Sequence, residues 1–127
     1  MSPIAAALLI AQAPAPAPLW EQVHASDEAA VFVDPASLRR TGDAVRLRQR
    51  TEYRRTGGDG MRALVFEATV NCTTRTYVMH RVEGYRENGS LIRAFDVPAD
   101  MAGREIRLET DDPSGQALHR RVCGRAA

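Results

Sequence analysis

The stretch 61–86 constrains the fold more than any other part of the chain. It consists of two runs in which apolar and polar residues alternate, joined by 71–74. Alternation with a period of two is typical of half-buried β-strands, because successive side chains point to opposite faces of a sheet. In the first run, one side carries Leu64, Phe66, Ala68, Val70 and Cys72. We predict that this side is turned to the core and that the two runs form a central antiparallel hairpin.

Shorter segments of the same kind flank this hairpin. We predict strands over 19–25, 29–34, 44–55, 90–95 and 104–109. Clusters of glycine, asparagine and aspartate separate them, as is typical of turns between antiparallel strands. Asn88-Gly89 is the strongest of these turn signals. A single helical turn capped by Asp34 is predicted after the second strand.

The segment 112–124 predicts a C-terminal helix. Asp112 is a favourable N-cap, and Gly124 is a favourable residue just past the end. Leu118 and Val122 provide only a narrow apolar stripe. Because isolated helices shorter than about 12–15 residues are marginal in water, this helix must dock onto the sheet.

The chain has two cysteines, Cys72 and Cys123, so only one intramolecular disulfide can form. Closing a loop of about 50 residues contributes about 4 kcal/mol to stability in the chain-entropy model. A redox-catalytic role is the alternative, but the chain has no Cys-x-x-Cys motif and no base beside either cysteine. We therefore predict an α+β fold, an antiparallel sheet of about six strands with the C-terminal helix packed on one face and tied to it by the disulfide. That helix is expected to cover Leu64, Phe66 and Val70.

The N-terminus indicates export. An apolar core at 4–10 is followed by Ala11-Gln12-Ala13, the small-x-small pattern of a signal-peptidase site. We predict a signal peptide over 1–13, an Ala/Pro linker over 14–18 and a single domain over 19–127. The apolar core is too short to span a membrane. The alternative is an apolar tail that is not removed.

The charges are nearly balanced, with 17 basic and 16 acidic residues and a formal net charge of +1. No overall field attracts nucleic acid or an anionic membrane, so neither is predicted as a partner. All the basic residues are arginines, and a row of them follows one side of the strand 44–55: Arg46, Arg48, Arg50 and Arg54. A polyanion site is one interpretation of this row. The solvated face of an antiparallel sheet is the interpretation that we favour.

The histidines do not predict a metal site. His24, His80 and His119 lack metal-ligand spacing, and two cysteines alone cannot complete a tetrahedral zinc site. We predict no metal, no cofactor and no enzymatic activity. The enzymatic alternative would use His80 with Glu67 or Glu83, but a lone histidine on a strand is more often a packed and satisfied side chain.

The order of features resembles the surface-adhesin protein E family of small exported bacterial proteins, over residues 19–124. The features that carry the resemblance are Trp20, the run Val33-Asp34-Pro35-Ala36-Ser37-Leu38, the long arginine-bearing strand, Asn71-Cys72-Thr73-Thr74-Arg75-Thr76-Tyr77, Tyr85 with Gly89, and the C-terminal stretch from Pro113 to Cys123. A tryptophan expected before the final helix is missing, and we expect Ile106 or Leu108 in its place.

The resemblance implies an antiparallel sheet with a C-terminal helix joined to it by a disulfide. It also implies adhesion to host matrix proteins, as in the name-giving members. We predict an exported, non-enzymatic binding protein of the cell surface or the periplasm. Its partner is a protein of the extracellular matrix or of the bacterial envelope. An inhibitor-like envelope module with a bacterial partner is the alternative.

We expect the binding surface on the face opposite the core. That face carries more apolar side chains than a fully solvated face needs: Val65, Tyr77, Met79 and Tyr85. A protein ligand or weak homodimerisation would cover them.

Overall fold

The computed structural model describes residues 18–101, 103–109 and 111–124. The predicted signal peptide and most of the Ala/Pro linker lie outside the described residues. The elements, in chain order, are β1 (Glu21–Ala25), β2 (Ala29–Val33), η1 (Pro35–Ser37), β3 (Arg39–Thr41), β4 (Ala44–Tyr53), β5 (Met61–Asn71), β6 (Thr76–Arg86), β7 (Leu91–Asp96), β8 (Glu105–Arg107) and α2 (Pro113–Cys123).

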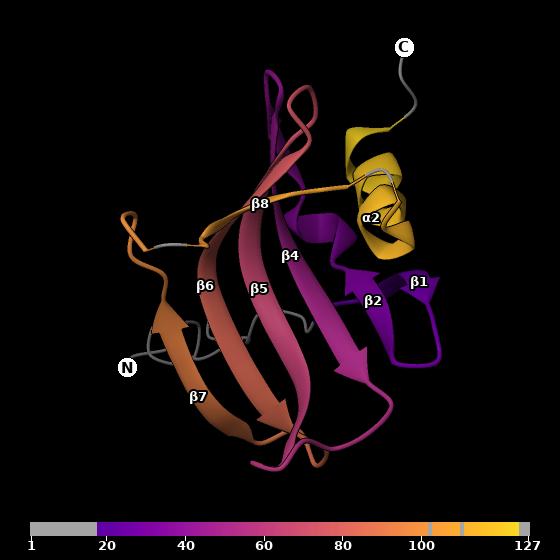
Figure 1. Cartoon of the computed structure of the whole chain (residues 1–127), viewed down its shortest axis with the longest axis vertical. Coiled ribbons are helices and arrows are strands. Elements are labelled where there is room, and N and C mark those ends of the chain that lie inside the picture. The colour runs from indigo at the N-terminus through magenta and orange to yellow at the C-terminus, as the bar shows by residue number, and fades with distance from the viewer. Residues whose placement is uncertain (1–17, 102, 110, 125–127) are drawn as a thin grey trace, which may run out of the picture.

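The strands form one antiparallel sheet in the order β1-β2-β4-β5-β6-β7. The two short strands lie off this path, with β3 paired to β4 and β8 paired to β6. Helix α2 lies on one face of the sheet, beside β1 and β2 (Figure 1). The predicted fold class is therefore confirmed, whereas β3 was not predicted from the sequence.

The hairpin of β5 and β6 contains a β-bulge that changes which side chains share a face. Glu67 pairs with Arg81, but the next residue, Ala68, pairs with Met79, so that His80 is the extra residue on β6. Up to Met79, the odd-numbered residues of β6 lie on the same face as α2, and from Arg81 onward they lie on the other face. A bulge has this effect because one inserted residue shifts an alternation of period two.

The main core lies between α2 and the end of the sheet that it covers. Its buried members come from β2, β4, β5, β6, the segment after β8 and α2: Val33, Val45, Leu47, Ala68, Val70, Tyr77, Leu108, Leu118 and Val122. The helix packs chiefly along β1, where the guanidinium of Arg121 binds the carboxylate of Glu21 through two hydrogen bonds. Val70 is part of this core, as predicted, but Leu64 and Phe66 are not.

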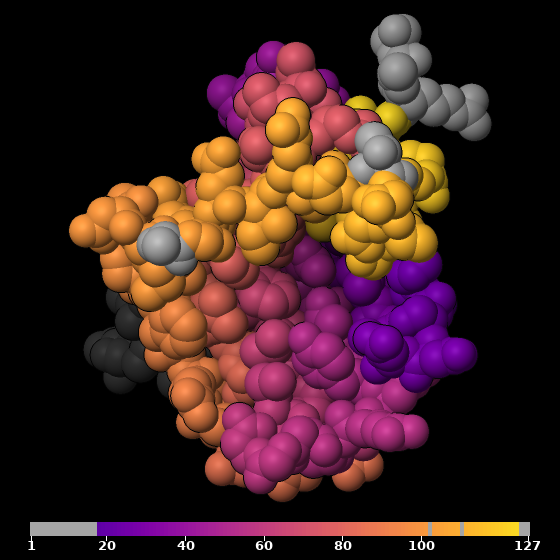
Figure 2. Space-filling view, in the orientation of Figure 1, coloured from indigo at the N-terminus to yellow at the C-terminus, as the bar shows by residue number. Residues whose placement is uncertain are grey.

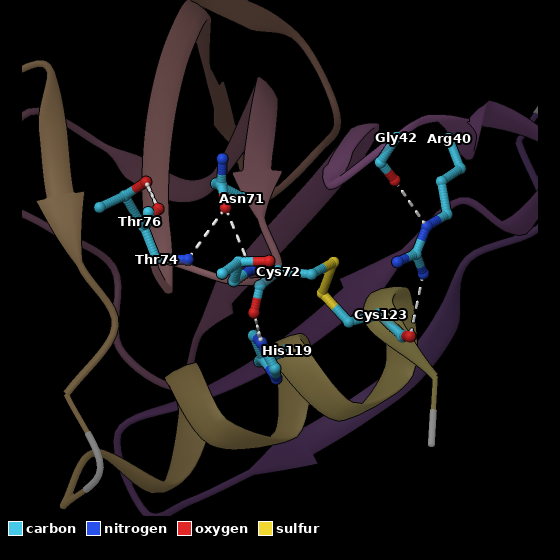
Figure 3. The surroundings of a disulfide bond; sticks show 9 residues. Arg40, Gly42, Asn71, Cys72, Thr74, Thr76, His119 and Cys123 are labelled. Atoms are coloured by element: carbon cyan, nitrogen blue, oxygen red, sulfur yellow. Dashed lines mark hydrogen bonds between the residues drawn. A yellow bond between two sulfur atoms is a disulfide. The ribbon is translucent and has the colours of Figure 1, made fainter. Parts of the chain in front are cut away.

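The ends of α2 are those expected from its sequence. The side chain of Asp112 accepts a hydrogen bond from the backbone N–H of Ser114, and Gly124 follows the last turn with a positive φ. At its C-terminal end, Cys123 is bonded to Cys72 with the two Cα atoms 5.7 Å apart. Arg40 of β3 donates a hydrogen bond of 3.1 Å to the carbonyl oxygen of Cys123, so the unpredicted strand also holds the helix end (Figure 3).

A second apolar layer lies on the face opposite α2. Ala63 and Val65 of β5 are buried there, and Val65 is only 3% exposed. The prediction that β5 buries only its Leu64 side was wrong. The cross-strand neighbours of Val65 are Arg50 and Glu83, and long charged side chains cover apolar surface with their stems while their charged ends stay in water.

Ion pairs connect the charged side chains of this opposite face. Arg48 donates to Glu83 at 3.0 Å, and the hydroxyl of Tyr85 donates to the same carboxylate at 3.0 Å. Arg81 pairs with Glu83 at 3.4 Å and with Asp96 at 3.1 Å. Within the arginine row, Arg48 is thus paired with Glu83, and Arg50 is paired with Glu52 at 3.4 Å.

Candidate functional site

Helix α2 leaves part of its own face of the sheet uncovered. The helix lies beside β1 and β2, and the segment containing β8 crosses the face next to it (Figure 1). The remaining surface belongs to parts of β4, β5, β6 and β7, and it lies as a recess below the orange segment in Figure 2. We call this surface the open face, and it has two hollows.

The first hollow, which we call the α2 pocket, lies between the open face and the N-terminal end of the helix. Its volume is about 220 Å³. Its lining residues come from the sheet, from the segment around β8 and from the start of the helix: Val31, Gln49, Phe66, Tyr77, Met79, Ile106, Leu108, Asp112, Ser114, Gly115 and Leu118. Ile106 is 45% exposed, which makes it the most accessible apolar member of this lining.

Two buried polar side chains belong to the lining of the α2 pocket. The hydroxyl of Tyr77 donates a hydrogen bond of 2.8 Å to Oε1 of Gln49. The amide nitrogen of Gln49 donates to the hydroxyl of Thr51 at 3.3 Å. Both Gln49 and Tyr77 are more than nine-tenths buried, and this burial raises the pKa of the Tyr77 hydroxyl well above its ordinary value. The Tyr77 hydroxyl is therefore protonated at any physiological pH.

The second hollow, the β7 pocket, has a volume of about 200 Å³. It is lined by Asp59, Met61, Leu64, Val82, Gly84, Ile92, Arg93 and Phe95. Phe66 of the α2 pocket is the cross-strand partner of Val82, so the two hollows adjoin on the sheet. Phe95 is 44% exposed, and the open face is therefore apolar and accessible at both hollows.

Residues 20–124 match the family model of surface-adhesin protein E. The chain belongs to the surface-adhesin protein E family. No curated protein and no solved structure matches it. The family match confirms the resemblance predicted from the order of sequence features, and it suggests an exported or surface location.

The four residues predicted to form a binding surface in this adhesin-family chain do not share one face. Tyr77 and Met79 precede the bulge at His80 and lie on the α2 side, whereas Val65 and Tyr85 lie on the opposite side. Val65 and Tyr77 are also buried. Met79 alone among the four combines partial exposure with a place in one of the two hollows.

Sequence reasoning missed the residues that make the open face accessible. Phe95 was assigned to a short strand without a role, and Ile106 was considered only as a replacement for a missing tryptophan. Leu64 and Phe66 were placed under the helix. The alternation correctly put Leu64 and Phe66 on the α2 side of β5. The alternation does not indicate how much of the α2 side of the sheet the helix covers.

His80, the extra residue of the bulge, has a polar neighbour at each ring nitrogen. Its Nε2 atom lies 2.7 Å from the hydroxyl of Thr69, and its Nδ1 atom lies 3.5 Å from Nη2 of Arg104. Arg104 can only donate, so Nδ1 accepts and Nε2 carries the proton. Desolvation lowers the pKa of His80, and the positive charges of Arg46 and Arg104 lower it further. Glu83, one proposed partner, binds arginine and tyrosine side chains instead.

Among the described residues, no group of three or more histidine, cysteine, aspartate and glutamate side chains is arranged to hold a metal ion. Within the same residues, no helix has the length and apolar character needed to cross a membrane. The open face with its two hollows is thus the best-supported candidate site.

Proposed function

We propose that this chain is an exported, non-enzymatic binding protein that attaches to another protein through the open face. The observation that carries the proposal is the pair of adjoining apolar hollows on the part of the sheet that α2 leaves uncovered. Exposed apolar surface of this kind is typical of protein–protein contact sites. Membership of the surface-adhesin protein E family supports the same role.

The size of the hollows favours a protein partner over a small-molecule substrate. Pockets that bury a drug-sized ligand usually measure about 300–1,000 Å³. The two hollows measure about 220 and 200 Å³, and each suits a single side chain. A partner that presents two apolar side chains to adjoining hollows would have a well-packed contact centre, which is where binding energy concentrates.

The disulfide supports an oxidising compartment, because such bonds persist mainly in exported proteins. The partner is then a matrix protein outside the cell or a protein of the bacterial envelope. Fractionation of the native host separates the two. Surface exposure of the chain favours an adhesin, and a soluble periplasmic pool favours an envelope partner.

The binding test uses substitutions at positions that are already exposed, so that the fold is retained. The purified chain is measured by surface plasmon resonance against immobilised matrix proteins and immobilised envelope proteins. Phe95→Asp is expected to weaken binding to the true partner at least 10-fold, because a charge would enter the β7 pocket. Met101→Asp is the matched control, since Met101 is 45% exposed against 44% for Phe95 and does not line either hollow. Equal losses in the two variants, or no loss in either, would contradict the proposal.

A further inference from the structure

We propose that the α2 pocket receives one phenolic ring, the side chain of a tyrosine of the partner protein. This inference rests on the proposed function, because it names the side chain that the open face selects. Three properties of the pocket lead to it: its volume, its apolar walls and the hydrogen-bonding capacity of Gln49 and Tyr77.

The volume admits one aromatic ring with a small substituent. An engineered apolar cavity of about 150 Å³ is large enough to bind benzene. The α2 pocket, at about 220 Å³, has room for such a ring and one further polar group. It is too small for the larger ligands that fill pockets of about 300 Å³ and above.

The walls suit the faces and edges of an aromatic ring. Phe66 can contact a second ring in an edge-to-face or offset arrangement, and Met79 contributes a polarizable thioether that contacts ring edges favourably. Leu108 and Leu118 close the side next to the core. Ile106 is the half-exposed wall residue past which a side chain of the partner would enter.

The unused hydrogen-bonding groups of Gln49 and Tyr77 favour a ligand with a hydroxyl group. A glutamine amide has two N–H donors and an oxygen with two lone pairs, and a tyrosine oxygen can accept as well as donate. The bonds to Thr51 and between Tyr77 and Gln49 use one donor of the amide, one lone pair of its oxygen and the hydroxyl proton. One N–H donor and acceptor lone pairs are left. A hydroxyl can both accept from this donor and donate to these acceptors.

The pocket disfavours negatively charged groups. Asp112 is the one ionisable carboxylate of the lining, and its Oδ1 already accepts from the backbone N–H and the hydroxyl of Ser114. A carboxylate in the pocket would meet this negative charge and would lose its hydration among apolar walls. A neutral phenol meets neither cost. A phenylalanine side chain would fill the same volume but would leave the spare groups of Gln49 and Tyr77 without partners.

The probe for this inference is p-cresol, the side chain of tyrosine as a free molecule. Binding is followed by chemical-shift changes in two-dimensional NMR spectra of the oxidised chain, with toluene and p-toluate as comparison probes. We expect p-cresol to shift the resonances of residues that line the α2 pocket and to bind at least 10-fold more tightly than toluene or p-toluate. Equal affinity for p-cresol and toluene, or shifts confined to the β7 pocket, would overturn the inference.

Two variants test whether the probes bind in the α2 pocket. The double variant Gln49→Leu with Tyr77→Phe removes both members of the buried polar pair while keeping apolar bodies, so it should abolish the preference for p-cresol over toluene. Ile106→Trp, at a half-exposed wall position, should block entry of all three probes without unfolding the chain. If the double variant fails to fold, the probe comparison on the native chain and on Ile106→Trp still decides the question.

Failure of this inference and failure of the proposed function give different results. If Phe95→Asp abolishes partner binding but Ile106→Trp leaves it unchanged, the open face binds the partner and the α2 pocket does not receive its side chain. If the native chain binds p-cresol as expected but Phe95→Asp leaves partner binding unchanged, the phenol site stands and the open-face proposal falls.

Discussion

The Nε2 atom of His119 lies 3.0 Å from the carbonyl oxygen of Cys72, within one turn of the bond that joins Cys123 to that same cysteine (Figure 3). A carbonyl oxygen only accepts, so the histidine nitrogen donates. Helix α2 is thus held to the end of the central hairpin by a covalent bond and a hydrogen bond to one residue.

The disulfide is expected to dominate this attachment. Cys72→Ser and Cys123→Ser should each destabilise the chain by about 2–5 kcal/mol. The double variant should be no worse, because either substitution already removes the bond. The hydrogen bond from His119 contributes only about 0.5–1.5 kcal/mol, too little to order a helix whose backbone costs about 1–2 kcal/mol per residue.

Thermal melts of the three cysteine variants, with and without reductant, measure this effect. Reductant should lower the melting temperature of the native chain to that of the variants and should leave the variants unchanged. Identical melting of all four proteins, or free thiols in chain isolated from its native host, would contradict the expected role of the bond.

The ion pair between Glu21 and Arg121 should make stability depend on pH. The hydrogen bond from Arg121 lowers the pKa of Glu21 below its ordinary value of 4.5. A depressed folded-state pKa contributes stability that is present above the ordinary pKa and is lost as the pH falls through the folded-state pKa. The melting temperature of Glu21→Gln should therefore fall less than that of the native chain when the pH is lowered below 4.5. Both side chains are partly exposed, so the difference is expected to be small and to shrink in high salt.

His80 should also make the chain less stable as the pH falls. Desolvation, Arg46 and Arg104 lower its pKa below the ordinary 6.5, and the opposing charge of Glu67 does not reverse this. The unfolded chain therefore binds the proton first, and stability is lost as the pH falls from 6.5 through the folded-state pKa. An NMR titration of the His80 ring should give a midpoint below 6.5, and His80→Gln should remove this part of the pH dependence. A midpoint above 6.5 would contradict the contact between Nδ1 and Arg104.

A substitution at Val65 tests whether the second apolar layer contributes to stability. Because it is 3% exposed beneath charged neighbours, Val65→Ala should destabilise the chain by about 1–3 kcal/mol through lost burial and a residual cavity. Val78→Ala is the control, since Val78 pairs with Thr69 on the same strand pair but is only partly buried. Urea unfolding of the two variants gives the comparison. Equal effects would mean that the charged side chains do not enclose Val65.

Much of this fold could be read from local patterns. The alternation of β5 and β6, the turn at Asn88-Gly89, and the cap residues Asp34 and Asp112 all lie where predicted. Each of these signals acts within a few residues, through side-chain period, turn conformation or a hydrogen bond to the adjacent backbone. The single pair of cysteines left no choice of disulfide.

The candidate site could not be predicted in the same way. Across His80 the apolar positions of β6 change from odd numbers, Tyr77 and Met79, to an even one, Val82. The sequence prediction did not take this change as the mark of a bulge and continued the odd-numbered side to Tyr85. The consequence of the bulge is that Tyr77 and Tyr85, both odd-numbered, lie on opposite faces.

The sequence by itself determined every strand except β3, the helix, the bond between Cys72 and Cys123 and the family to which the chain belongs, because these depend on local patterns and on their order. Only the tertiary structure decided that Val65 is buried under charged side chains and that Phe66 borders an open pocket. Both depend on cross-strand register and on where α2 docks, and those are set by contacts between residues far apart in the chain. The proposed binding surface is what the short helix, held at one end of the sheet, leaves uncovered.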